Sequence, residues 1–161
     1  MDLAPVMISL IVFALVAVPV ALIIRMEKKR KQSVLHSITK LAEKYNALIT
    51  QKEFWGKYAI AIDENSKKLI YMNYHPGKEG EYGFDLNKVK QCKIENVNKT
   101  IGVGNSRQST IYKLNLLLTF RDSKLPDSAI EFYNADNEGE LIADFQQAEK
   151  WEKLINSILK Q

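Results

Sequence analysis

Residues 111–120, IYKLNLLLTF, have the clearest strand pattern in the chain. From Leu114 to Phe120 every second residue is leucine or phenylalanine, and the residues between them are polar apart from Leu117. Such alternation is typical of a strand with one face on a core and the other in water. The stretch therefore predicts a half-buried strand of an antiparallel sheet.

Shorter strand candidates lie on both sides of this stretch. They are rich in aromatic and β-branched residues and are separated by polar turns. They cover residues 58–63, 68–74, 81–86, 89–97 and 129–133. The polar segment 98–110 either supplies a seventh strand or contains a turn. The chain from residue 51 onward thus predicts a small antiparallel sheet or barrel of six or seven strands.

The last segment has the spacing of an amphipathic helix. Apolar side chains recur every three or four residues, at Leu141, Phe145, Ala148, Trp151, Ile155 and Ile158. The helix begins near Leu141, or later at Asp144, which forms a capping-box pair with Gln147. Phe145, Trp151 and Ile155 are expected to plug one open end of the sheet and bury its core.

This order of elements resembles the pleckstrin-homology-like (PH-like) domains. The resemblance is carried by the strands over 57–133 and by the helix AEKWEKLINSIL at 148–159. PH-like domains close one end of a half-open barrel with a C-terminal helix that bears a nearly invariant tryptophan, which Trp151 matches. The resemblance implies an α+β domain with a single capped barrel, and it implies docking of proteins or peptides as one use of the fold.

The lipid-binding motif of that family is only partly present. It places a lysine, followed by K/R-x-R, across the first hairpin. Here the hairpin reads AIDENSKKLI, in which Lys67 and Lys68 have Asp63 and Glu64 beside them and no arginine follows. Phosphoinositide recognition therefore does not carry over, and Lys67 and Lys68 are left as candidates for a weak contact with anionic lipid.

Residues 3–24, LAPVMISLIVFALVAVPVALII, are apolar and uncharged. As a helix they would span about 33 Å, close to the thickness of a bilayer core. No lysine or arginine precedes them, so a retained transmembrane helix is favoured over a cleaved signal. Its basic flank is formed by Arg25, Lys28, Lys29, Arg30 and Lys31. This flank predicts a single-pass protein of the cell membrane whose main domain is cytoplasmic, and it is also able to attract anionic headgroups.

An apolar seam follows the basic flank. Val34, Ile38, Leu41, Tyr45 and Leu48 fall on one side of a helix. Two interpretations stay open: the seam packs on the chain's own domain, or it forms a dimeric coiled coil through residues 34–48. Three segments are therefore expected, namely an anchor at 1–24, a basic stalk at 25–50 and a PH-like domain at 51–161.

The net charge of +4 belongs to the N-terminal part. Residues 1–46 hold seven lysines and arginines against three acidic residues, and residues 47–161 hold sixteen of each kind. The domain itself is neutral. A nucleic-acid-binding domain would carry its excess positive charge in the folded part, so we expect no nucleic-acid partner.

Aromatic residues gather in the strand region. They are Trp55, Tyr58, Tyr71, Tyr74 and Tyr82. Such residues either belong to the core or form a binding surface, and in strands they are more often core.

Catalytic and metal-binding patterns are absent from the sequence. The single cysteine, Cys92, and the two histidines are far apart and show no metal-ligand spacing. We expect no enzyme and no cofactor. The sequence favours a membrane-tethered interaction module that holds a partner protein, or an accessory subunit of a membrane complex. The alternative is a domain that senses anionic lipid at the membrane surface.

Overall fold

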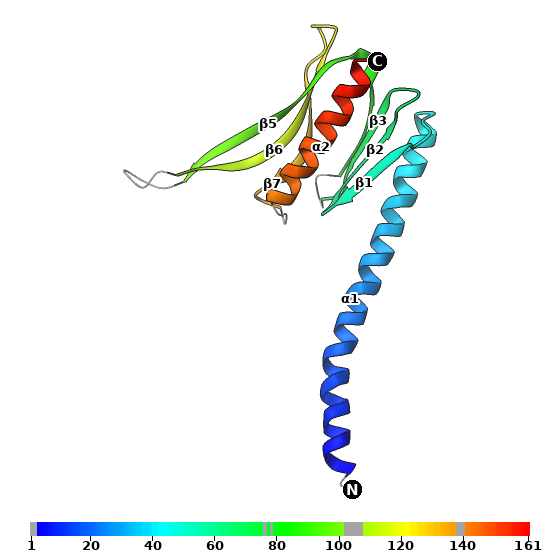
Figure 1. The fold of residues 1–161 in the computed structure, drawn as a ribbon, viewed down its shortest axis with the longest axis vertical. Coiled ribbons are helices and arrows are strands. Elements are labelled where there is room, and N and C mark those ends of the chain that lie inside the picture. Colours follow the sequence, from blue (N-terminus) through cyan, green and yellow to red (C-terminus); the bar gives the residue numbers. More distant parts are fainter. Residues whose placement is uncertain (1–2, 76, 78, 102–107, 138–140) are drawn as a thin grey trace. The chain divides into compact units, whose positions relative to one another are not determined.

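The computed structural model describes all residues except 1–2, 76, 78, 102–107 and 138–140, and it describes the backbone alone at 3–12, 14, 27, 30–31, 101 and 108. Two compact units, Met1–Ser37 and Ile38–Gln161, divide the chain. Helix α1 (Leu3–Lys44) begins in the first unit and ends in the second. The elements that follow it are β1 (Gln51–Trp55), β2 (Tyr58–Asp63), β3 (Lys68–Asn73), β4 (Gly80–Asp85), the 3-10 turn η1 (Leu86–Lys88), β5 (Val89–Ile101), β6 (Gln108–Phe120), β7 (Ser128–Asn134) and α2 (Leu141–Leu159), as Figure 1 shows.

The predicted transmembrane helix at residues 3–24 is wrong. In the described part of the chain, no helix has a stretch that is both long enough and apolar enough to cross a bilayer. The prediction rested on the apolar run and its basic flank, whereas α1 is one continuous helix that carries charged residues from Arg25 onward. The predicted single-pass location in a cell membrane, with a cytoplasmic domain, is overturned by the same finding.

The strands form two antiparallel sheets, so the predicted single barrel or sheet of six to seven strands is also wrong. One sheet has the order β1-β2-β3-β4 and the other the order β5-β6-β7. The break falls at η1, where the Asp85 carboxylate accepts a hydrogen bond from the Asn87 N–H at 3.0 Å. This cap starts a helical turn, which redirects the chain before β5 begins a new sheet.

Strand β1 is not expected from the sequence, because QKEFW lacks a clear alternation. It pairs with β2 through a two-residue turn in which Gly56 has φ +47°, a value that glycine adopts without strain. The segment 98–110 holds no strand of its own among its described residues. Its two ends extend β5 and β6, and residues 102–107 lie outside the described residues.

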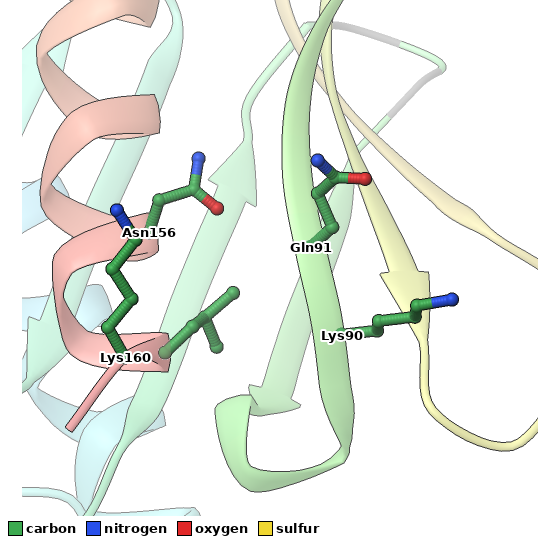
Figure 2. Close-up of a pocket in the computed structure, with 5 residues that line it drawn as sticks. Lys90, Gln91, Asn156 and Lys160 are labelled. Atoms are coloured by element: carbon green, nitrogen blue, oxygen red, sulfur yellow. The ribbon is translucent and has the colours of Figure 1, made fainter.

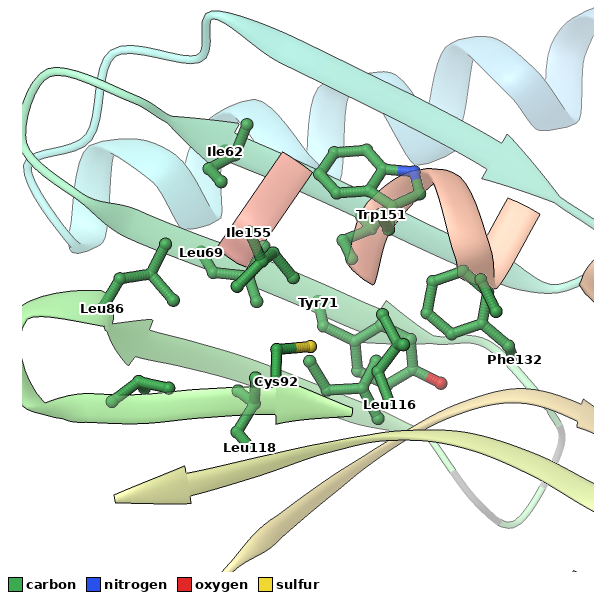
Figure 3. Packing of buried hydrophobic residues seen from close by; sticks show 14 of the residues in the cluster. Ile62, Leu69, Tyr71, Leu86, Cys92, Leu116, Leu118, Phe132, Trp151 and Ile155 are labelled. Atoms are coloured by element: carbon green, nitrogen blue, oxygen red, sulfur yellow. The ribbon is translucent and has the colours of Figure 1, made fainter. Parts of the chain in front are cut away.

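The core lies between the two sheets and α2 (Figure 3). Each element contributes its inward-facing residues, which include Tyr58, Ile60, Ile62, Leu69 and Tyr71 from the four-stranded sheet, Cys92, Leu114, Leu116, Leu118, Ile130 and Phe132 from the three-stranded sheet, and Ala148, Trp151, Ile155 and Ile158 from α2. The alternation read from residues 114–118 thus marks the buried face of β6.

The opposite face of the four-stranded sheet is covered as well. Every residue of β2 is buried, which requires cover on both sides. Ile38 and Leu41 near the end of α1 are buried, and a Cβ at Gly83 of β4 would lie 2.5 Å from Cζ of Tyr45. The seam therefore packs on the chain's own domain at these three positions, whereas Leu48 at its end is 79% exposed.

Candidate functional site

The three residues expected to plug the sheet lie on α2. Trp151 is buried, and its indole N–H donates to Oε2 of Glu53 on β1 at 2.9 Å. The Lys150 ammonium donates to the same oxygen at 2.8 Å. Ile155 is fully buried and Phe145 is half-buried against the core. Helix α2 is thereby fastened to the first strand of the four-stranded sheet.

The two lysines considered for lipid contact have different surroundings. Lys68 donates to the carbonyls of Tyr45 and Asn46, at 2.6 and 3.0 Å, so its ammonium holds the segment that follows α1. Lys67 occupies the turn before β3 with φ +52°. Lys68 thus has an internal role in the fold, and the weak lipid contact considered for the pair stays a prediction.

The basic cluster after the apolar run lies on α1, in the first unit. Arg25, Lys28 and Lys29 are exposed, and the side chains of Arg30 and Lys31 lie outside the described ones. The structure gives these residues no ligand-binding arrangement within the part that it describes.

The edge of β5 is occupied by side chains of α2. The Cys92 N–H donates to Oδ1 of Asn156 at 3.2 Å, and Nδ2 of Asn156 donates to the Cys92 carbonyl at 2.8 Å. The Ile94 N–H donates to a carboxylate oxygen of Glu152 at 3.0 Å. The helix therefore supplies both hydrogen bonds that a neighbouring strand would make at Cys92 and one of those at Ile94.

A pocket of about 490 Å³ lies beside this contact. It is lined by Lys90, Gln91, Asn156, Leu159 and Lys160. Figure 2 shows Asn156 and Lys160 on α2 and Lys90 and Gln91 on β5, on the two sides of the pocket. Because Asn156 already bonds Cys92, this part of β5 offers no free backbone pair to an added strand.

The edge of β7 is occupied by aromatic side chains of the other sheet. The Trp55 indole N–H donates to the Phe132 carbonyl at 3.0 Å, and the Tyr71 hydroxyl donates to the Glu131 carbonyl at 2.8 Å. Part of each edge of the three-stranded sheet is thus covered, which is a common way to prevent unwanted strand pairing.

An aromatic row crosses the inner face of the four-stranded sheet. Neighbouring ring centroids lie 5.7 Å apart from Trp55 to Tyr58, 6.2 Å from Tyr58 to Tyr71, 6.0 Å from Tyr71 to Tyr82 and 6.4 Å from Tyr82 to Phe84. The row begins in the core, where Tyr58 and Tyr71 are buried, and reaches the surface at Tyr82, which is 49% exposed. Tyr82 therefore belongs to a surface, whereas Tyr58 and Tyr71 belong to the core.

Glu131 of β7 is the centre of a polar network at the buried end of this row. Its carboxylate accepts from the Tyr58 hydroxyl at 2.7 Å and from Nδ2 of Asn134 at 2.8 Å. The Lys113 ammonium lies 3.8 Å from the second carboxylate oxygen. Burial raises the pKa of Tyr58, and its hydrogen bond to Glu131 raises it further. Burial also raises the pKa of Tyr71, so both phenols stay protonated donors.

A cleft of about 390 Å³ opens where the aromatic row meets this network. It is lined by Tyr71, Asn73, Glu79, Tyr82, Lys113, Ala129, Glu131 and Asn134. These residues come from β3, β4 and the segment before it on one side, and from β6 and β7 on the other. The cleft lies directly beside the edge strand β4.

The outer edge of β4 carries backbone groups that point away from β3. The Leu86 N–H donates to the Lys67 carbonyl at 2.8 Å, so these two residues form a hydrogen-bonded pair next to the β3–β4 ladder. Hydrogen-bonded and non-hydrogen-bonded pairs alternate along antiparallel strands. Tyr82 and Phe84 accordingly turn their backbone groups toward β3, and Glu81 and Gly83 turn theirs outward. Among the residues that the structure describes, no hydrogen bond reaches these outward groups.

The described residues carry little that points to covalent or metal chemistry. Burial raises the pKa of the Cys92 thiol to about 12, with a further contribution from Glu152, so the thiol is protonated at neutral pH. Within the described part of the chain, no group of three or more His, Cys, Asp or Glu side chains is arranged to hold a metal ion.

The sequence indicates only part of this cleft. Tyr71 and Tyr82 stand out as strand aromatics, but Glu131 and Lys113 have no distinguishing context and meet only through the fold. Comparison of the chain with family models, with curated proteins and with solved structures found no match.

Proposed function

We propose that residues 38–161 form a PH-like, non-enzymatic interaction module that docks an extended segment of a partner protein along β4. The observation that carries the proposal is the cleft beside the outward backbone groups of β4. Side chains from other elements bond backbone groups of two residues on β5 and two on β7, while the outward groups of Glu81 and Gly83 on β4 carry no such bond among the described residues.

An extended partner segment would join the four-stranded sheet as a fifth strand. Its backbone would bond the outward groups of Glu81 and Gly83, which supplies affinity without regard to sequence. Its side chains would alternate between the cleft that contains Tyr82 and the opposite face, where Tyr45 covers Gly83. Sequence preference would therefore come from every second residue of the partner.

Two features support the PH-like part of the proposal. Two small antiparallel sheets enclose one core, and a C-terminal helix with a buried tryptophan closes it. The strands precede the helix in the order that the family has. The proposal does not include phosphoinositide binding, because the ammonium of Lys68 is bonded within the fold.

The test is a proline at one outward N–H. The Glu81 N–H faces away from β3, so Glu81→Pro removes a docking donor and no bond of the native ladder. The matched control, Glu81→Ala, removes the same carboxylate and keeps the N–H. Peptides would be selected against the full chain from a random library, and their dissociation constants measured with each variant.

We expect Glu81→Pro to weaken binding about tenfold and Glu81→Ala to change it less than twofold. Hydrogen exchange at the Glu81 and Gly83 amides should slow when a peptide is bound. A library that yields no peptide, or peptides that bind Glu81→Pro as well as the wild-type chain, would show that β4 is not the docking edge.

A further inference from the structure

We infer that the cleft beside β4 selects partner segments that place an arginine or lysine side chain between Glu79, Glu131 and the ring of Tyr82. This inference rests on the proposed docking along β4 and names the chemistry of the docked segment. It is carried by the charge of the cleft, the aromatic face at its mouth and the geometry of its carboxylates.

The first step is the charge of the lining. Two carboxylates, those of Glu79 and Glu131, face one ammonium, that of Lys113. A strand that carries a cation into the cleft is therefore attracted, and one that carries a carboxylate is repelled.

The second step is that Glu131 is held in position before any partner arrives. Tyr58 fixes one carboxylate oxygen at 2.7 Å, and Asn134 fixes the other at 2.8 Å. The side chain of Glu131 is still 19% exposed, so part of the carboxylate faces the cleft. A guanidinium or ammonium that reaches it would meet an acceptor whose orientation has already been set.

The third step is the ring of Tyr82. It is 49% exposed, and it is stacked on Phe84 with an interplanar angle of 8°. Tyr71 supports it from the core side at a centroid distance of 6.0 Å. A supported tyrosine face beside carboxylates suits a flat guanidinium, which stacks and forms ion pairs at the same time.

Lys113 already occupies the place near the Glu131 carboxylate that a partner cation would take. Its ammonium lies 3.8 Å from Glu131, longer than a charge-assisted hydrogen bond, and 5.8 Å from the centroid of the Tyr112 ring. This loose placement lets a partner cation replace it near Glu131. Removal of the Lys113 charge should accordingly strengthen binding of a cationic partner.

The experiment uses three blocked nine-residue peptides of alternating threonine and valine. They carry arginine, norleucine or glutamate at the central position. Binding to the full chain would be measured by fluorescence anisotropy with the wild type, Glu79→Gln, Lys113→Met and Glu81→Pro. Glu131 is left unchanged because it holds Tyr58, and thermal melts would verify that each variant is folded.

We expect the arginine peptide to bind at least about fivefold more tightly than the norleucine peptide, and the glutamate peptide to bind most weakly. Glu79→Gln should reduce the advantage of arginine, and Lys113→Met should increase it. Equal binding of arginine and norleucine peptides that still depends on the Glu81 N–H would overturn the inference and leave the docking proposal standing. If every peptide binds the Glu81→Pro variant as tightly as it binds the wild type, both the inference and the docking proposal are overturned.

Discussion

The side-chain amide of Asn156 bonds both backbone polar groups of Cys92, at 3.2 Å to the N–H and 2.8 Å to the carbonyl. A primary amide has the same donor and acceptor pair as a peptide group, so Asn156 takes the place of one residue of an added strand. The bond fixes the register of α2 against the edge of β5.

Replacement of Asn156 should therefore lower the free energy of unfolding by more than its half-buried position indicates. Asn156→Leu leaves the N–H and carbonyl of Cys92 without partners beside a helix that restricts water. We expect the free energy of unfolding to fall by about 2 kcal/mol, measured by urea denaturation. Lys153→Leu is the matched control on an exposed position of the same helix and should change it by less than about 0.5 kcal/mol. Equal effects of the two changes would show that the amide pair contributes nothing.

Trp151 connects α2 to the opposite sheet through Glu53. Burial acts to raise the pKa of Glu53, but hydrogen bonds from Lys150, Gln147 and Trp151 outweigh it and lower the pKa. Trp151→Phe keeps an aromatic ring and removes the indole donor, so the pKa of Glu53 should rise toward its ordinary value. An NMR titration of the Glu53 carboxyl would measure the shift, with Lys153→Ala as the control. An unchanged pKa would mean that the indole does not bond this carboxylate.

The sequence predicts the parts of this fold that depend on local pattern. Alternation at 114–118 marks the core face of β6, and the spacing of Trp151 and Ile155 marks the buried side of α2. The split into two sheets could not be predicted, because it depends on how the short turn η1 redirects the chain. The membrane span expected at 3–24 rested on the length of the apolar run and on its basic flank, and no helix in the described part of the chain is long and apolar enough to cross a bilayer.

The cleft shows the same limit on prediction. Tyr71 and Tyr82 are adjacent because they form a cross-strand pair, which their sequence positions do not reveal. Glu131 and Lys113 lie on different strands of the other sheet, and they meet the tyrosines only where the two sheets approach each other. Side chains gathered by tertiary contacts carry no signal in spacing along a single segment.

Gly83 is required because the Tyr45 ring lies against it. A Cβ at Gly83 would come within 2.5 Å of the ring, and the ring covers a buried sheet face. We expect Gly83→Ala to lower the free energy of unfolding by about 1–3 kcal/mol, measured by urea denaturation. At Gly80 a Cβ would instead meet the end of the exposed Tyr82 side chain, which can move aside. Gly80→Ala is thus the matched control and should lower the free energy of unfolding by less than Gly83→Ala does.

The coupling between Gly83 and Tyr45 can be measured separately. If the clash with the Tyr45 ring causes the destabilisation, Gly83→Ala should lower the free energy of unfolding much less in a chain that already carries Tyr45→Ala. The two single changes and the double change form a thermodynamic cycle whose interaction energy should be at least about 0.5 kcal/mol. Purely additive effects would point to backbone strain at Gly83 in place of the ring contact.

Cys92 provides a probe of global unfolding. Its thiol is buried, and its pKa is raised to about 12 by burial and by Glu152. A disulfide reagent at pH 8 should therefore modify the native chain only as fast as the chain opens. The rate should rise with urea in step with the unfolding transition. Rapid modification of the native chain without denaturant would contradict the burial of this thiol.

Asp63 links the segment after α1 to the β2–β3 turn and makes stability depend on acid. Burial acts to raise its pKa, but hydrogen bonds from the Ser66 hydroxyl and the N–H groups of Ser66, Leu48 and Asn65 lower it to about 2 from an ordinary 3.8. Because the folded-state pKa is depressed, the stabilisation is complete above about pH 4 and is lost as the pH falls toward 2. Asp63→Asn should lower the free energy of unfolding by about 1–2 kcal/mol at pH 7. The difference in the free energy of unfolding between wild type and variant should become smaller as the pH falls from 4 to 2. A gap that stays constant over this range would show that the carboxylate charge is not what these donors stabilise.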